Sequence, residues 1–354
     1  MFQLRYQSHH LSSSQSTLPN LEKLPEFAQE AFTFCKDWLD GKDSFVQATS
    51  GSTGTPKIQE ITRQQMEASA KATETFFGTN SEFKLLCCLN PAYIAGKIML
   101  VRALVWDCEV TLVEPSADPM ASEDGHFDFV AMVPLQVETS LSSRSSLEKL
   151  KSIQTLLIGG APLSDSLQMS LHQEGIAAWQ TFGMTETVSH IALAKIGEGE
   201  LVYQCLPDVH IGLTEEGTLW VQSPMSGHAK LATLDRIELR SKNSFVWLGR
   251  ADFVINSGGI KLFPEQLEKK ISAWMFERYS GMPYFFYGEV DERLGQRLVL
   301  FVEGEQSEVT LEVLEEELKK FLGKFEIPKQ IYLLPRFKYT PSGKINRPET
   351  AKRT

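Results

Sequence analysis

Short apolar segments alternate with helical stretches through the middle of the chain, and this alternation constrains the fold more than any other feature. Apolar runs lie at 84–89, 109–113, 127–133 and 155–158, and stretches with helical spacing lie at 96–106, 145–151 and 165–174. Such alternation is typical of a largely parallel sheet whose strands are connected by helices. The sequence therefore predicts an α/β fold, preceded by helices at 21–39 and 64–77.

The pattern changes after Gly199. Short strands are predicted at 219–222, 237–240 and 245–248. They are followed by a helix whose first turn holds Pro264, two strands at 284–290 and 297–303, an amphipathic helix at 311–322 and a last strand at 330–334. We therefore expect a large N-terminal α/β domain with a small β-rich subdomain over residues 1–251. A small, mobile α+β domain is expected over residues 252–354, and the chain of 354 residues is long enough for both.

Charge and composition exclude several classes of protein. The formal net charge is −10 and no run of Lys and Arg occurs, which excludes a nucleic-acid partner on electrostatic grounds but leaves room for a local anion site. There is no apolar run of about 18 residues, so no membrane span is expected. The five cysteines show no CxxC pair, and the N-terminus lacks the apolar stretch of a signal peptide. These features predict a cytoplasmic protein with reduced thiols.

A segment rich in Ser, Thr and Gly, ATSGSTGTPK at 48–57, follows the predicted strand at 45–48. Exposed backbone N–H groups, hydroxyls and a lysine suit a polyphosphate. The segment is not a Walker A loop, because Thr55 and Pro56 separate Gly54 from Lys57. A flexible linker is the alternative. The candidate phosphate-binding residues are Thr49, Ser50, Gly51, Ser52, Thr53, Gly54, Thr55 and Lys57.

This loop resembles that of the adenylate-forming superfamily, which includes acyl- and aryl-CoA synthetases, and five further motifs follow in the family's order. They are LLIGGAPL at 156–163, QTFGMTET at 180–187, GTLWVQSP at 217–224, GRADFVINSGGIKLFPEQLE at 249–268 and TPSGKINR at 340–347. The resemblance implies ATP, Mg²⁺ and coenzyme A as ligands. It assigns adenine binding to Gly160, Ala161, Pro162, Thr181, Phe182 and Gly183, ribose binding to Asp235 and Arg250, and phosphate and metal binding to Thr185 and Glu186, with Glu186 as the metal ligand.

The same resemblance implies three roles in the C-terminal part. Asp252 is expected to be the hinge, since a pivot needs residues at the end of an element that absorb a change in φ and ψ. Gly258 and Gly259 are expected to face coenzyme A, although SGG also suits an ordinary turn. Lys344 is expected to be the catalytic lysine, acting with Thr185 and Glu186.

The acid site is expected at LNPAYIAGKIMLVRAL, 89–104, where Tyr93 replaces a His common in the family. Together with Met184, the residues Tyr93, Lys97 and Arg102 are the substrate candidates. An Arg in an apolar helix needs an anionic partner, either a structural Asp or Glu or a second carboxylate on the substrate. The second possibility resembles the o-succinylbenzoate–CoA ligase branch of menaquinone biosynthesis.

The resemblance implies an ATP-dependent acid–CoA ligase that forms an acyl-adenylate and then a thioester. Another aryl- or acyl-CoA ligase, an adenylation module that loads a carrier protein and an adenylate-binding protein without turnover are the alternatives. The phosphate loop begins about 48 residues in, earlier than in typical members, which suggests a compact version of the family whose acyl pocket and possible homodimer interface differ.

Overall fold

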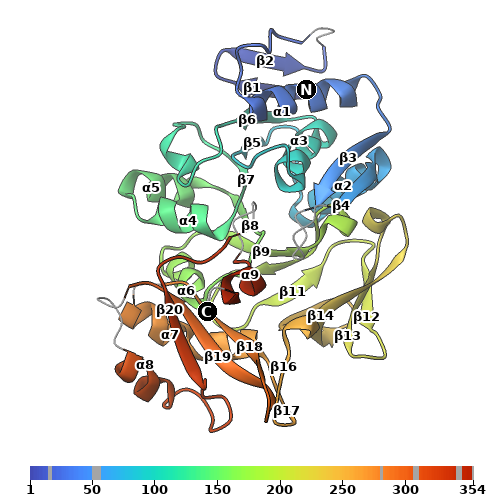
Figure 1. Cartoon of the computed structure of the whole chain (residues 1–354). Coiled ribbons are helices and arrows are strands. Elements are labelled where there is room, and N and C mark those ends of the chain that lie inside the picture. Colours follow the sequence, from blue (N-terminus) through green and yellow to red (C-terminus); the bar gives the residue numbers. More distant parts are fainter. Residues whose placement is uncertain (15–17, 50–56, 280–281, 306–310, 340–344, 353–354) are drawn as a thin grey trace.

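The computed structural model describes residues 1–14, 18–49, 57–279, 282–305, 311–339 and 345–352. Its largest element is a 13-stranded sheet with the strand order β12-β13-β14-β15-β11-β10-β9-β8-β7-β5-β6-β1-β2 (Figure 1). A second, five-stranded sheet and a two-stranded ribbon, β3–β4, complete the strands of the described part. The predictions for residues 50–55 and for Lys344 lie outside the described residues.

The predicted parallel sheet forms the middle of the large sheet. Its strands are β5 (Lys84–Cys87), β6 (Glu109–Leu112), β7 (Phe129–Met132), β8 (Thr155–Ile158) and β9 (Ala178–Gly183), all paired in parallel. The connecting helices are α3 (Ile94–Trp106), α4 (Pro134–Leu141), α5 (Arg144–Ser152) and α6 (Asp165–Gln173). All four residues of β8 are buried, as expected for a strand covered on both faces. The α/β prediction is confirmed.

The β-rich segment continues this sheet instead of standing apart from it. Its strands are β10 (His190–Lys195), β11 (Val202–Cys205), β12 (His210–Leu213), β13 (Thr218–Gln222), β14 (Lys230–Ser241) and β15 (Ser244–Arg250). Strand β10 pairs antiparallel with β9, so one hydrogen-bonded sheet runs from the parallel strands into the antiparallel ones. The predicted subdomain therefore shares its backbone hydrogen bonds with the rest of the large sheet.

The N-terminal segment adds a hairpin at the far edge of the sheet, β1 (Gln3–Tyr6) and β2 (His9–Ser12), with β1 parallel to β6. Helix α1 (Glu26–Leu39), the ribbon strands β3 (Ser44–Thr49) and β4 (Lys57–Thr62) and helix α2 (Arg63–Phe77) follow. Helix α1 begins five residues later than predicted because Pro25 is its N-cap and disfavours helical backbone at Leu24.

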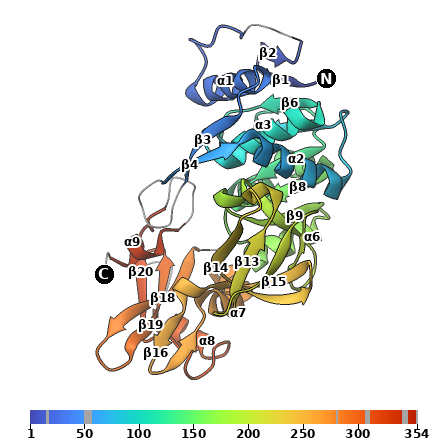
Figure 2. The same cartoon turned by 90° about the vertical axis from the view of Figure 1, so that its right-hand side faces the viewer.

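The described residues of the C-terminal part form the second sheet and three helices. Its strands are β16 (Ile255–Ser257), β17 (Ile260–Leu262), β18 (Tyr284–Asp291), β19 (Gly295–Glu303) and β20 (Gln330–Leu334), and its helices are α7 (Pro264–Tyr279), α8 (Leu311–Leu318) and α9 (Arg347–Ala351). Figure 2 shows this sheet below the large one. The 3₁₀ turn η4 (Ala251–Phe253) connects the two sheets. Helices α6 and α7 also touch, since Ser272 Oγ donates a hydrogen bond to Asp165 Oδ2 at 2.6 Å. The domain boundary at residue 252 and the mobility of the C-terminal part stay predictions.

All five cysteines are free and buried. Burial raises the pKa of each thiol, for Cys87, Cys108 and Cys205 to about 12. Within the described residues, no helix is both long enough and apolar enough to span a membrane.

Candidate functional site

The adenine-binding motifs meet at the carboxyl ends of the parallel strands β8 and β9, where ligands bind in many α/β sheets. Gly159 follows β8, and a Cβ atom there would lie only 2.2 Å from Thr181 Oγ1, so these two segments touch. Gly160 adopts a φ of +85°, and Gln180 Nε2 donates a hydrogen bond to the carbonyl of Ala161 at 3.1 Å. The structure therefore places the turn of Gly160, Ala161 and Pro162 beside Thr181.

Phe182, the predicted adenine neighbour, is half-buried in this strand. Its ring packs edge to face against Tyr203 and Phe245, at centroid distances of 5.7 and 5.1 Å. Core packing therefore fixes the ring, and contact with adenine stays a prediction. Gly183 follows, and a Cβ there would lie 2.3 Å from the carbonyl oxygen of Ser189, so this position needs glycine.

A strained turn follows Thr185 and Glu186. These two residues begin the short turn η2 (Thr185–Thr187), and Val188 adopts φ 64° and ψ −51°. The Ser189 N–H donates to the Thr187 carbonyl at 2.6 Å, which makes a classic γ-turn centred on a β-branched residue. A backbone conformation of this kind typically costs about 1–3 kcal/mol, and residues with such strain are common at functional sites.

The metal prediction depends on Glu186, which is exposed. No group of three or more His, Cys, Asp or Glu side chains able to hold a metal occurs in the part of the chain that the structure describes. Mg²⁺ in nucleotide sites is usually held by one or two carboxylates together with substrate phosphates and water. A single exposed glutamate fits such a site and does not fit an all-protein cage.

The ribose candidates lie opposite each other, Asp235 on β14 and Arg250 on β15. Trp247 Nε1 donates to Asp235 Oδ1 at 2.9 Å. Arg250 makes a two-pronged ion pair with the hinge candidate Asp252, at 2.9 and 2.8 Å, and this hydrogen bonding raises the pKa of the guanidinium. The predicted ribose and hinge residues are thus brought together at the connection between the two sheets.

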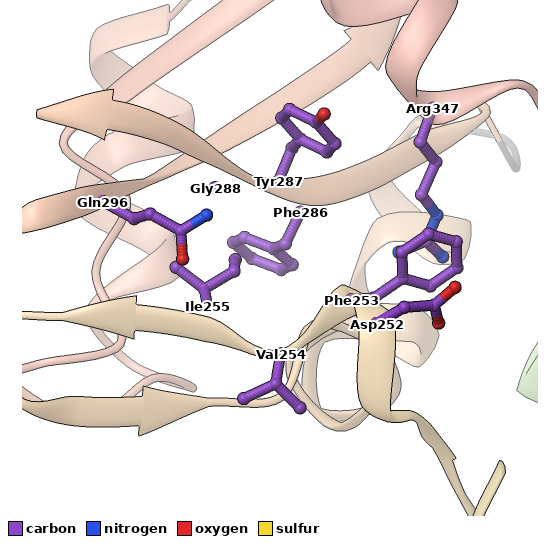
Figure 3. Close-up of a pocket in the computed structure, with 9 residues that line it drawn as sticks. All are labelled: Asp252, Phe253, Val254, Ile255, Phe286, Tyr287, Gly288, Gln296 and Arg347. Carbon is purple, nitrogen blue, oxygen red and sulfur yellow. The ribbon is translucent and has the colours of Figure 1, made fainter. Parts of the chain in front are cut away.

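A pocket lies on the C-terminal side of this connection. Figure 3 shows Phe253 and Arg347 side by side, with Phe286, Tyr287 and Gln296 also lining the pocket. The Arg347 guanidinium pairs with Glu268 at 2.9 Å and lies 5.0 Å from the Phe253 ring centroid. These contacts tie the start of α9 to the hinge segment.

The remaining C-terminal candidates are only partly described. Gly258 and Gly259, with φ of 58° and 83°, form the two-residue turn of the β16–β17 hairpin, and positive φ at both positions already requires glycine-like residues. Their contact with coenzyme A stays a prediction. Lys344 lies outside the described residues, while Tyr339 and Ile345 on either side of it pair as an antiparallel bridge. Thr49 and Lys57 are likewise described only by the backbone, opposite each other in the β3–β4 ribbon.

The acid-site candidates lie on α3, a helix buried on nearly all sides. Tyr93 is its N-cap and is 40% exposed. The ammonium of Lys97 lies 3.2 Å from Glu30 of α1, so this lysine already has a carboxylate partner. Arg102 lies deeper and has different neighbours, and the structure does not bring the two cations together. Met184 is half-buried and packs on the edge of the large core.

Arg102 is 1% exposed and has no carboxylate partner among the described residues. Its hydrogen bonds go to neutral atoms, from Nη1 to Met99 Sδ at 3.1 Å and from Nη2 to Ser189 Oγ at 3.3 Å and His190 Nδ1 at 3.4 Å. Its buried Nε has no partner in the same part of the chain. Burial lowers the pKa of Arg102 to about 9. Within the described residues this buried cation therefore has no counter-ion.

Sequence reasoning missed Ser189 and His190. They follow the QTFGMTET motif after one intervening residue, Val188, and a histidine at the start of the apolar run HIALA was the available signal. Ser189 and His190 are 87 and 88 positions away from Arg102 in the chain, and only the tertiary fold brings their side chains within hydrogen-bonding distance of it. Such a contact cannot be inferred from local pattern.

Comparisons with known proteins identify relatives of this chain. The family model of AMP-binding enzymes matches residues 4–218. A solved acyl-CoA synthetase (AMP-forming)/AMP-acid ligase II-like protein from Dyadobacter fermentans is 37% identical, covers 93% of this chain and 95% of its own, and superposes with a TM-score of 0.63.

Two further relatives carry more specific names. The 2-succinylbenzoate–CoA ligase of Enterococcus faecalis is 26% identical over 331 residues, which are 85% of this chain and 67% of that protein. The O-succinylbenzoate coenzyme A synthetase of Bacillus subtilis, solved with ATP and magnesium, is 20% identical with a TM-score of 0.72, covering 86% of this chain and 69% of that one. The latter likeness concerns the fold. The ordered motifs and these matches agree, and the chain belongs to the family of AMP-binding enzymes.

Proposed function

We propose that this chain is an ATP-dependent acid–CoA ligase whose acid carries two carboxylates, with 2-succinylbenzoate as the substrate. The observation that carries the choice of acid is the buried Arg102 guanidinium, which lacks a carboxylate partner in the described part of the chain. The names of the relatives support the same acid.

The first half-reaction forms a mixed anhydride. One carboxylate oxygen of the acid attacks the α-phosphorus of ATP, and the bond to the bridging oxygen breaks to release pyrophosphate. Because both reactants are anions, positive charge and hydrogen-bond donors are needed at the junction. We assign this role to Lys344 and to the hydroxyl loop that ends at Lys57. Glu186, with Thr185 beside it, would hold Mg²⁺, which supplies further charge neutralisation when bound.

The second half-reaction transfers the acyl group to sulfur. The coenzyme A thiol loses its proton and attacks the acyl carbon, and AMP leaves with the electrons of the broken C–O bond. The proposal includes a rotation of residues 252–354 about Asp252 between the two half-reactions. The ion pair between Arg250 and Asp252 supports this assignment, because it lies on the chain connection between the two sheets.

The second carboxylate of the acid would explain why the buried Arg102 has no counter-ion in the described residues. A charge removed from water without a counter-ion is unfavourable, and the lowered pKa of Arg102 has this cause. A carboxylate at the guanidinium would supply the missing negative charge through charge-assisted hydrogen bonds. In an acid with one carboxylate, that group would react with ATP, and the positive charge of Arg102 would have no counter-ion.

The test is a screen of pyrophosphate release with ATP and Mg²⁺, followed by mass detection of the thioester after coenzyme A is added. We expect release with 2-succinylbenzoate and a thioester of the matching mass. Release with monocarboxylic acids only would support another aryl- or acyl-CoA ligase and contradict the choice of acid. An adenylate that coenzyme A does not consume would support a module that loads a carrier protein. A homodimer and a cytoplasmic location stay predictions of the sequence.

A further inference from the structure

We infer that His190 is a positioning residue that holds the Arg102 guanidinium in place without neutralising its charge. The inference rests on the proposed function, in which Arg102 receives the second carboxylate of the acid. In this role His190 supports the specificity of Arg102 for acids with two carboxylates.

The imidazole of His190 lies between two helices. It is buried at the start of β10 and contacts Thr73 of α2 through Nε2, at 3.1 Å from Oγ1. Its other nitrogen, Nδ1, lies 3.4 Å from Arg102 Nη2 on α3 and 3.4 Å from Ser189 Oγ. The ring thus connects the guanidinium to the neighbouring helix.

We assign the ring proton from the hydrogen bonds of Thr73. Its Oγ1 lies 3.0 Å from the Ser69 carbonyl, which can only accept a hydrogen bond. With its single hydrogen donated to that carbonyl, Thr73 Oγ1 accepts from His190, and this assignment puts the ring hydrogen on Nε2. In a neutral ring Nδ1 is then the acceptor. Nδ1 is the nitrogen that faces the guanidinium, so in this tautomer it can accept a hydrogen bond from Arg102 Nη2.

The neutral ring leaves the charge of Arg102 available. Burial, together with the charge of Arg102, holds the pKa of His190 well below its ordinary value, so the ring stays uncharged at neutral pH. An aspartate or glutamate at this position could hold the guanidinium equally well, but it would neutralise it and remove the attraction for a substrate carboxylate. A neutral acceptor orients the cation and keeps its charge for the ligand.

The alternative is that His190 only stabilises the contact between α2 and β10. If His190 had only this role, every disruptive substitution of it would lower the stability of the protein and would lower the turnover of all substrates equally. The positioning role predicts that a negative charge introduced at residue 190 lowers the preference for the diacid even when the shape of the side chain is kept. The matched pair His190→Asn and His190→Asp separates the two roles, because Asn and Asp have nearly the same shape and differ in charge.

The kinetic test compares 2-succinylbenzoate with two acids that each lack one of its carboxylates, 4-oxo-4-phenylbutanoate and 2-butyrylbenzoate. The measured quantity is the ratio of kcat/KM for the diacid to that for the better monoacid. His190→Asn, whose amide oxygen can accept from Arg102, should keep this ratio within about tenfold of wild type. His190→Asp should lower it by roughly a hundredfold, chiefly through KM, because its carboxylate pairs with Arg102. Ile191→Val, in the same strand and without a polar group, is the control.

Equal ratios for the Asn and Asp variants would overturn the inference. A second measurement does not depend on any substrate: ¹⁵N NMR of the histidine-labelled full chain at pH 7. We expect His190 as the neutral tautomer protonated at Nε2, and a ring protonated at Nδ1 would overturn the inference even if the variants folded poorly. If wild type activates none of the three acids, the proposed function fails, while the NMR result still decides the state of His190.

Discussion

Replacing Arg102 with methionine should make the ligand-free protein more stable and the enzyme less specific. The two effects have opposite signs because the guanidinium is buried without a counter-ion in the described structure. The lowering of the Arg102 pKa from its ordinary value to about 9 corresponds to roughly 5 kcal/mol against the charged form. At pH 7, below both values, the full penalty acts on the folded state and is relieved only as the pH rises above about 9.

The net gain in stability is smaller than this penalty. Methionine loses the hydrogen bonds to Ser189 and His190 and the contact of the guanidinium with the Phe129 ring at 5.6 Å. Replacing buried charged groups by apolar side chains of similar volume is often neutral or stabilising by about 1–4 kcal/mol. For a chain of this length that range corresponds to a rise in Tm of roughly 1–5 °C, measured by calorimetry without substrate.

The catalytic effect is measured with the same protein. Loss of a charge-assisted contact in a water-poor pocket costs about 2–5 kcal/mol, or roughly thirty- to several-thousand-fold in kcat/KM. Arg102→Met should show this loss for 2-succinylbenzoate and much less for an acid without the second carboxylate. Lys97→Met is the matched control on the same helix, since Lys97 already pairs with Glu30, and it should affect both acids alike. A fall in Tm together with an equal loss for both acids would refute the reasoning and make Arg102 a structural residue.

Three further predictions follow from other parts of the molecule. Lys344→Ala should abolish pyrophosphate release but still convert supplied acyl-adenylate and coenzyme A to thioester; equal loss of both would contradict a role in adenylation alone. Asp252→Pro fixes φ near −65° and should let the adenylate accumulate while thioester formation falls, whereas normal turnover would remove Asp252 from the pivot. Val188→Gly should be more stable than Val188→Ala in denaturant titrations, because both variants lose the buried valine side chain and only glycine relieves the positive φ. An alanine variant at least as stable as the glycine variant would mean that the turn is not strained.

The regular elements of the fold could be predicted because their apolar patterns are local. The strands Thr155–Ile158 and Gln330–Leu334 have the predicted bounds, and the helix predicted to contain Pro264 begins there. The pattern does not show which strands pair. The hairpin of Gln3–Tyr6 and His9–Ser12 was missed, since its place beside β6 depends on a contact with a strand about 100 residues away.

In the site, too, local motifs could be predicted and long-range contacts could not. Motifs identified the turn at Gly160 and the segment at Thr181, and the parallel pairing of β8 and β9 brings them together as any such pair would. The sequence also singled out Arg102 as a buried cation, but it left open whether a protein carboxylate neutralises it. Only the side-chain contacts of the folded chain answer this for the described residues, because they give Arg102 the neutral partners Ser189 and His190.

The most direct test of the central claim is a competition assay with the wild-type protein. Equal concentrations of 2-succinylbenzoate, 4-oxo-4-phenylbutanoate and 2-butyrylbenzoate are incubated with limiting ATP, Mg²⁺ and coenzyme A, and the thioesters are quantified by mass spectrometry. A guanidinium that selects the second carboxylate predicts at least about thirtyfold more thioester from the diacid than from either monoacid. Comparable amounts of thioester from the diacid and a monoacid would contradict the account.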